Sequence, residues 1–140
     1  MEELGLKTHL KFNPKFGRLL EISDEGAKVI LETTEEMAVD EEGLVHGGFI
    51  FGAADFCAMA TVNEPYVVLA RVSNCEFLAP VEVGDIVEFN GKILLKDKRK
   101  VDVSVEGYLE QIKVFEGLFG CVVLDKHVLS KKKEEDKKTK

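Results

Sequence analysis

The feature that most constrains the fold is a long apolar segment in the middle of the chain. From Phe49 to Val62 it is rich in Ala, Met and Phe and holds few β-branched residues. This composition and length favour a helix, predicted to begin at the HGG of residues 46–48 and to end near residues 63–65. Because the helix is apolar on nearly every side, other elements of the chain must cover it.

Six further segments predict the strands that provide this cover. Residues 17–23 and 27–33 form a hairpin, whose DEG turn lets Gly26 adopt a positive φ. Four more strands are predicted after the helix, at residues 67–78, 86–96, 100–110 and 113–124. No helix separates these later strands, so the sheet is antiparallel and the fold class is α+β. The simplest arrangement is a strongly curved antiparallel sheet wrapped around one long central helix.

Length and composition predict one domain at residues 1–129 and a charged tail at residues 130–140. The tail holds six Lys against three acidic residues, so it is predicted to be disordered. The whole chain has a net charge of −7, and without the +3 of the tail the domain carries −10. This charge argues against nucleic acid as a partner.

The sequence contains neither a membrane-spanning run nor a secretion signal, so a cytoplasmic protein with no membrane partner is expected. Cys57, Cys75 and Cys121 are odd in number and widely spaced, which fits neither a zinc site nor a disulfide framework. They are expected to be free, buried thiols. A nucleophilic Cys57 stays open, although no histidine lies near it in the sequence.

One carboxylate, Asp55, lies inside the apolar segment. A buried, unpaired carboxylate is costly, so Asp55 is expected to be paired, neutralised or used in chemistry. At the start of the same helix, free N–H groups and the helix dipole favour a developing negative charge, and Gly47 and Gly48 let a ligand approach the backbone closely. These residues predict an oxyanion hole, with His46 beside it.

Spacing then predicts an oligomer. Gly47 and Asp55 are eight residues apart, or roughly 12 Å along a helix, so one carbonyl group cannot contact both. Two copies of the helix lying antiparallel would bring Gly47 of one copy near Asp55 of the other. A shared site of this kind predicts an obligate symmetric dimer with two equivalent sites.

The same residues also have structural interpretations. Two glycines before a helix are common, and His46 can simply cap or pack against the helix start. Asp55 can pair with a structural arginine such as Arg71.

Two motifs resemble the hotdog-fold thioesterases, in particular the phenylacetic-acid-degradation branch. They are LVHGGFIFGAADFCAMATVN in the helix and EFLAPVEVGDIVEF at residues 76–89, and the likeness covers roughly residues 17–125. The resemblance implies that the Gly47 amide polarises a thioester carbonyl, with His46 beside it. It also implies that Asp55 attacks that carbonyl or activates water.

Two positions depart from the pattern of that family. Many members carry Asn six residues before the histidine, where this chain has Asp40, an acid that cannot donate a hydrogen bond unless protonated. Some members carry Ser or Thr where this chain has Ala70. Both departures reduce the polar groups expected around the reacting acid.

The expected function is hydrolysis of a small or medium acyl-CoA thioester by a dimer or a dimer of dimers. No metal or prosthetic group is implied, and coenzyme A is part of the substrate. Arg71 and the basic hairpin tip, including Lys98 and Arg99, are candidate contacts for its phosphates, although a charged tip is usually a solvated turn. Gly48 is a further candidate for substrate binding.

Two alternatives remain open. One is an enoyl-CoA hydratase or dehydratase, in which His46 and Asp55 would have to supply the acid–base pair. The other is a non-catalytic acyl-CoA binding or sensing module, although no DNA-binding segment fits in the first 16 residues.

Overall fold

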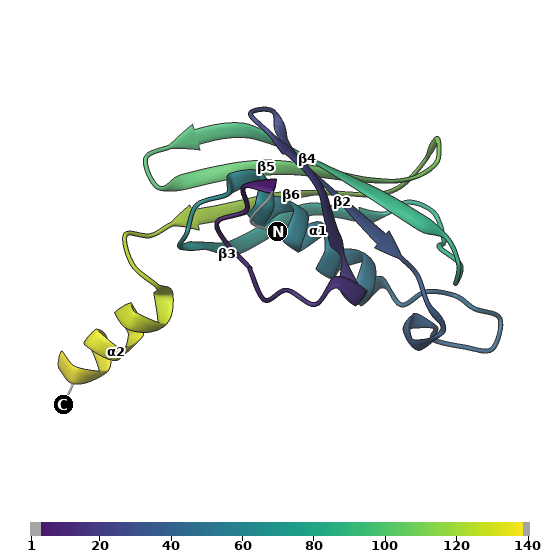
Figure 1. Ribbon diagram of the computed structural model, residues 1–140, viewed down its shortest axis with the longest axis horizontal. Helices are drawn as coiled ribbons and strands as arrows, with labels where there is room; N and C mark the ends of the chain where they lie inside the picture. Colours follow the sequence, from purple (N-terminus) through teal and green to yellow (C-terminus); the bar gives the residue numbers. More distant parts are fainter. Residues whose placement is uncertain (1–3, 139–140) are drawn as a thin grey trace.

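The computed structural model describes residues 4–138 and consists of one curved sheet, one long central helix and a shorter C-terminal helix (Figure 1). The sheet is formed by β1 (Arg18–Ser23), β2 (Gly26–Glu32), β3 (Val67–Phe77), β4 (Ile86–Asp97), β5 (Lys100–Leu109) and β6 (Ile112–Val123). The helices are α1 (Gly47–Val62) and α2 (Val128–Lys138), with 3-10 turns η2 (Pro14–Phe16) and η3 (Glu35–Met37). The strand order is β1-β2-β4-β5-β6-β3, and all pairs are antiparallel. The predicted hotdog fold is therefore confirmed.

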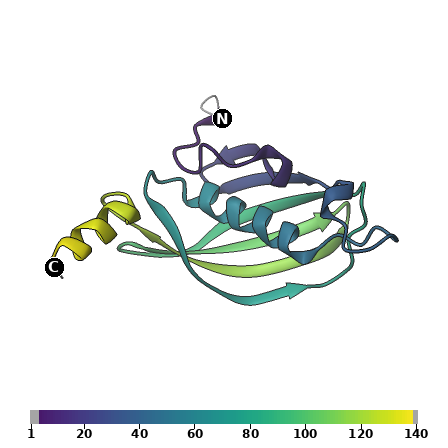
Figure 2. The ribbon, with the colours of Figure 1, turned by 90° about the horizontal axis from the view of Figure 1, so that it is seen from below.

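The sheet curves around α1, which lies along its concave face (Figure 2). The buried face of α1 is dominated by small side chains, so the helix approaches the strands closely, as in Ala53, Ala54, Cys57, Ala58 and Ala60. Phenylalanines fill the remaining core: Phe56, Phe89, Phe115 and Phe119 are fully buried. Burying this apolar surface is the main force that holds helix and sheet together.

One polar contact fixes α1 on the sheet. The buried Thr61 hydroxyl donates to the carbonyl of Cys57 at 2.8 Å and accepts the N–H of Ala27 in β2 at 3.2 Å. Gly91 of β4 lies directly against Thr61, and any side chain at Gly91 would collide with that hydroxyl. The glycine is therefore required by close approach of the helix to the sheet.

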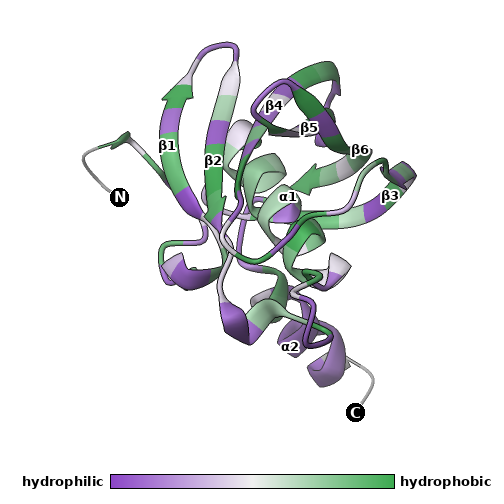
Figure 3. Ribbon diagram, turned by 90° about the vertical axis from the view of Figure 1, so that its right-hand side faces the viewer, coloured by the Kyte–Doolittle hydropathy of each residue, from purple (hydrophilic) through white to green (hydrophobic). Residues whose placement is uncertain are grey.

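The element bounds agree closely with those predicted from the sequence. The turn between β1 and β2 has Gly26 at φ 149°, and the two later hairpin tips place Lys98 and Glu110 at φ 55°. Helix α1 ends at Asn63, which takes the left-handed conformation at φ 51°. Figure 3 shows the contrast expected from composition, with α1 largely hydrophobic inside the sheet and α2 hydrophilic.

Residues 130–138 of the predicted tail belong to α2 (Val128–Lys138), and residues 139–140 lie outside the described residues. The His127 Nδ1 atom accepts the N–H of Leu129 at 3.0 Å and caps the helix start. Lys126 pairs with Glu134 at 2.5 Å, and Lys131 pairs with Asp125 at 3.5 Å. Because α2 buries little apolar surface, the helix propensity of its residues and these ion pairs stabilise it instead.

The cysteines are free, as predicted, and two of them are buried. Cys75 is exposed on β3, which corrects the expectation that all three are buried. Burial raises the pKa of Cys57 to about 12, so this thiol stays protonated at neutral pH and is a poor nucleophile. In residues 4–138, neither helix has the length and apolar character needed to cross a bilayer.

Candidate active site

The loop before α1 is ordered by backbone hydrogen bonds and by Asp40. The His46 N–H donates to the Met37 carbonyl at 2.8 Å, and the Val45 N–H donates to the Val81 carbonyl at 2.9 Å. One carboxylate oxygen of Asp40 accepts three backbone N–H groups at 3.0, 3.0 and 3.2 Å, those of Glu42, Gly43 and Leu44. Asp40 thus orders this loop by accepting hydrogen bonds from the backbone, and a carboxylate does this without donating a hydrogen bond of its own.

His46 is the N-cap of α1. Its Nδ1 atom accepts the N–H of Gly48 at 2.7 Å, so the neutral ring carries its proton on Nε2. The capping interpretation of His46 is therefore confirmed, and its Nε2–H stays available. The Gly48 amide, in contrast, is already engaged, so it is free for a ligand only if the imidazole turns away.

Gly47 carries the free amide at the helix start. Within the part of the chain that the structure describes, no acceptor takes its N–H. A Cβ at Gly47 would lie 3.3 Å from the Phe77 ring, which covers this position. Gly47 borders an apolar cleft of about 320 Å³, here called the Gly47 cleft, which is also lined by Leu44, Val45, Ile50, Phe77, Leu78, Ala79, Pro80, Val81 and Val114.

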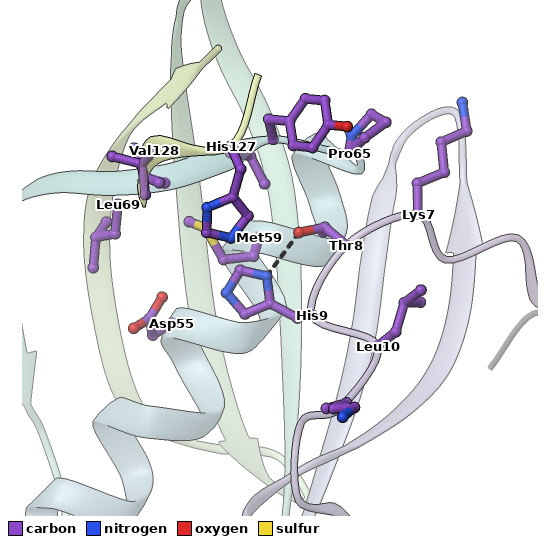
Figure 4. A pocket seen from close by; sticks show the side chains of 14 residues that line it. Lys7, Thr8, His9, Leu10, Asp55, Met59, Pro65, Leu69, His127 and Val128 are labelled. Carbon is purple, nitrogen blue, oxygen red and sulfur yellow. Dashed lines mark hydrogen bonds between the residues drawn. The ribbon is translucent and has the colours of Figure 1, made fainter. Parts of the chain in front are cut away.

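Asp55 lies in the middle of α1 and borders a different cleft, of about 630 Å³. This Asp55 cleft is lined by Lys7, Thr8, His9, Leu10, Lys11, Met59, Pro65, Tyr66, Val67, Val68, Leu69, His127 and Val128 (Figure 4). Among residues 4–138 the half-buried carboxylate has neither a hydrogen bond nor an ion pair. Burial raises the pKa of Asp55, so the carboxylate is a stronger base than an exposed aspartate.

Arg71 does not pair with Asp55, which removes the structural interpretation of that carboxylate. Arg71 is exposed on β3, and its side chain lies against Gly120 of β6. The register of β3 against β6 shifts between Leu69 and Arg71, so the strand bulges at Ala70. Ala70, where some family members carry Ser or Thr, is therefore exposed at this bulge and lines neither cleft.

The predicted phosphate contacts lie outside both clefts. Lys98 and Arg99 form the tip between β4 and β5, and Arg99 pairs with Asp125 at 3.7 Å. The lysines that line the Asp55 cleft are instead Lys7 and Lys11. These residues were missed in the sequence, and the KTHLK run of residues 7–11 is the signal that could have indicated them.

The sheet leaves β3 unpaired along one edge. Among the described strands, β3 pairs with β6 alone, and its outer residues from Ala70 to Phe77 are mostly exposed. A long open edge of this kind presents free N–H and C=O groups that can pair with another strand.

Comparison with known families shows which superfamily the chain belongs to. A family model described as the thioesterase superfamily matches residues 42–116, more than half of the chain. The chain belongs to the thioesterase superfamily. The match includes the end of the loop before α1, all of α1, the strands β3, β4 and β5, and the first residues of β6.

Solved structures similar to this thioesterase-superfamily chain extend over nearly its full length. Uncharacterized protein PH1136 from Pyrococcus horikoshii gives a TM-score of 0.85 at 47% identity, covering 88% of this chain and 95% of that one. Cj0977, a sigma28-regulated virulence protein from Campylobacter jejuni, gives 0.84 at 38% identity with the same coverage. The PaaI protein from the phenylacetic acid degradation operon of E. coli gives 0.72 at 18% identity, covering 81% and 83%, which shows a shared fold alone.

Curated relatives of this superfamily member are longer proteins. A methylthioribose-1-phosphate isomerase from Aquifex aeolicus is 43% identical over 122 residues, which make up 86% of this chain and 26% of that protein. Transcription factor FapR from Caldanaerobacter subterraneus is 29% identical over 115 residues, 82% of this chain and 56% of that protein. The chain thus spans between about a quarter and about half of these relatives.

Proposed function

We propose that the protein hydrolyses acyl-CoA thioesters at a site shared by two copies of the chain. The observation that carries this proposal is the separation of its two reactive groups. In one chain, a free Gly47 amide borders one cleft, and an unpaired Asp55 carboxylate borders another. Neither cleft holds both the group that stabilises an oxyanion and the group that activates a nucleophile.

A second copy can join the two halves through β3. Antiparallel pairing of two β3 edges about a twofold axis continues the sheet and places the two α1 helices side by side in opposite directions. The Gly47 end of each helix then approaches the Asp55 region of the other. The exposed β3 edge and the position of α1 on the concave face support this arrangement.

The chemistry follows from these groups. Asp55 of one protomer takes a proton from water while the water oxygen bonds to the thioester carbon, and the C=O π electrons move onto oxygen. The Gly47 N–H of the other protomer and its helix dipole stabilise that oxyanion. The C–S bond then breaks with its electron pair on sulfur, and the thiolate takes the proton from Asp55.

Direct attack by Asp55 is the alternative order, with water then hydrolysing the mixed anhydride. A single turnover in ¹⁸O-labelled water tests direct attack. Label incorporated into the Asp55 carboxylate supports the nucleophile, because that oxygen enters only when water attacks the Asp55 carbonyl of the anhydride, and a general base keeps its own oxygens.

The apolar lining of the Gly47 cleft suits an acyl chain, and Lys98, Arg99 and Arg71 stay predicted contacts for the coenzyme A phosphates. Lys7 and Lys11 border the Asp55 cleft and provide a nearer set of cations.

Thiol release from a panel of acyl-CoAs tests the reaction, and complementation tests the shared site. Asp55→Asn removes the base, and Gly47→Pro removes the N–H at a helix position that accepts proline. Each variant is expected to be inactive alone. Refolding the two together in equal amounts should restore about a quarter of wild-type activity, because half of the dimers are mixed and each mixed dimer has one intact site. Absence of recovery from folded mixed dimers contradicts the shared site.

The similarity to transcription factor FapR supports one second candidate, a module that binds an acyl-CoA without turnover. Titration with acyl-CoA followed by calorimetry separates the two functions. Tight binding with no thiol released over hours supports the module and contradicts the hydrolase.

A further inference from the structure

The N-terminal segment is held against α1 at two points. Next to the helix C-cap, the Lys7 N–H donates to Asn63 Oδ1 at 2.8 Å, and Asn63 Nδ2 donates to the Gly5 carbonyl at 3.0 Å. Further along, Phe12 stacks on Phe56 with ring centroids 4.2 Å apart and planes 2° from parallel. His9 lies between these two anchors, so its backbone is fixed on both sides.

The backbone of His9 is in the left-handed region at φ 54°, which few residues other than glycine adopt. The Phe12 N–H donates to the His9 carbonyl at 3.0 Å and closes the turn. The anchored segment therefore holds His9 in an unfavourable conformation, a feature that often marks functional positions.

The ring of His9 faces the Asp55 cleft with one nitrogen free. Its Nδ1 atom is 2.8 Å from the hydroxyl of the buried Thr8, so Nε2 is the nitrogen left for the cleft. Figure 4 shows this second nitrogen on the side of the ring that points toward the Asp55 carboxylate. The two groups border the same cleft and make no direct hydrogen bond or ion pair with each other.

The surroundings favour a neutral imidazole. Although His9 is exposed to the cleft, the cleft walls partly remove water from the ring, and this desolvation lowers the pKa of His9. The titratable groups around it are Lys7 and Lys11 of its own segment, Asp55 of α1, Tyr66 before β3 and His127 before α2.

We propose that His9 is a catalytic residue that holds the attacking water together with Asp55. This inference rests on the proposed hydrolysis. In the neutral tautomer whose Nδ1–H is donated to the Thr8 hydroxyl, His9 presents Nε2 as an acceptor. The water donates one hydrogen to Nε2 and the other to the Asp55 carboxylate, which aims a lone pair at the thioester carbon. On attack, the proton given up moves to Asp55 and later to the thiolate, while the other hydrogen stays on the new carboxyl oxygen.

His127 borders the same cleft but suits this role less well. Its Nδ1 caps α2, and its ring packs edge-on to Tyr66. His127→Gln is therefore a matched control, expected to keep kcat within about twofold of wild type.

Two substitutions at residue 9 separate the function of Nε2 from a structural role. Asparagine tolerates the left-handed backbone and places its amide near the position of Nδ1, leaving the Nε2 position empty. Glutamine extends an amide oxygen toward the Nε2 position and cannot titrate. With a short acyl-CoA, His9→Asn is expected to lower kcat by about 10- to 100-fold and to change KM by less than about threefold. His9→Gln should recover part of kcat.

The pH dependence of kcat distinguishes a catalytic role of His9 from a structural one, because a change in packing alone does not remove a titrating group from the profile. In the wild type, protonation of His9 removes the acceptor, so its ionisation contributes to the acidic limb of the profile. In His9→Gln that contribution is lost, and Asp55 alone sets the limb. Thermal melts verify that the variants fold.

Each outcome decides the inference. Wild-type kcat in a folded His9→Asn variant overturns it, as does a His9→Gln profile of unchanged shape, or a comparable loss in His127→Gln. If the wild type releases no thiol from any acyl-CoA, the proposed function and this inference fail together. If Asp55→Asn is inactive while His9→Asn is fully active, the inference alone fails.

Discussion

The two clefts along α1 are built in different ways. At the Gly47 cleft, most polar contacts around the helix start are local, because Asp40 orders the loop and His46 caps the helix, and one longer-range hydrogen bond joins Val45 to Val81. The Asp55 cleft joins the N-terminal segment, the middle of α1, the start of β3 and the residues before α2. Its key tether, from Lys7 to Asn63, spans 56 residues.

The reactivity of the Gly47 amide thus depends mainly on local structure, and that of the Asp55 carboxylate depends on tertiary contacts. The free amide of Gly47 follows from where the helix begins, so it is present whenever α1 forms. The environment of Asp55 depends on docking of distant segments, so its basicity and the position of His9 respond to any change in that docking. Variants at the two clefts should therefore fail in different ways.

The largest effect is expected at the Gly47 amide. Gly47→Pro removes one N–H at a position where the preceding His46 already has ψ 131°, which proline accepts. We expect kcat to fall about 10²- to 10³-fold, the usual loss of one oxyanion donor. Gly47→Ala is the matched control, because it meets the same Phe77 ring at 3.3 Å but keeps the N–H. Equal losses in both variants would mean that crowding by Phe77, and not the amide, is responsible.

A smaller effect is expected at Asp40, where the local contacts can be broken without touching the helix. Asp40→Ala removes the acceptor of three N–H groups and should lower the free energy of unfolding by about 1–2 kcal/mol. Asp40→Asn keeps an acceptor oxygen and should stay within about 0.5 kcal/mol of wild type. Chemical denaturation measures both, and an Asp40→Ala variant as stable as wild type contradicts the role of this loop.

At the other cleft, Asn63 tests the tertiary contact. Asn63→Gly keeps the left-handed C-cap but loses both hydrogen bonds to the N-terminal segment. Hydrogen exchange at the Lys7 amide should become about fivefold faster, which corresponds to about 1 kcal/mol. Asn63→Asp keeps the acceptor for that amide and should exchange more slowly than the glycine variant. Unchanged protection in Asn63→Gly would show that the segment is held by other contacts.

The smallest effect is a gain in stability at Asp55. Because burial raises the pKa of this carboxyl, the folded protein binds its proton more readily than the unfolded chain, and the charged form destabilises the fold at neutral pH. Asp55→Asn should therefore raise Tm by roughly 2–4 °C at pH 7. The gain should shrink as the pH falls through the raised pKa and vanish below the ordinary value of 3.8. A difference in Tm that does not depend on pH contradicts this assignment.

The sequence predicted the parts of the molecule that depend on local pattern. The helix with Gly47 and Asp55 and the six strands follow from apolar periodicity and turn residues, which act over a few positions. The capping role of His46 was among the interpretations left open. Engagement of the Gly48 amide depends on a side-chain rotamer that no spacing reveals.

The residues that were missed or misplaced depend on tertiary contacts. No pattern links His9 to Asp55, because a stacked Phe12 and a C-cap 56 residues from Lys7 bring them together. Arg99 pairs with Asp125 at the hairpin tip instead of lining a cleft. The prediction that the tail is disordered rests on its charge alone, and charge does not reveal the cap and the ion pairs of α2.

The contact of Thr61 with Ala27 and Gly91 sets the position of α1 along its own axis. In the proposed dimer this position matters twice over. If each antiparallel helix slides by some distance along the sheet, symmetry moves Gly47 of one copy and Asp55 of the other in opposite directions, so their offset grows by double that distance. A slip of about half an ångström at Gly91 would thus become a misalignment of about 1 Å between oxyanion donor and base, enough to cost on the order of 100-fold in rate. Gly91, which lines neither cleft, would therefore control how accurately the two halves of each shared site are aligned.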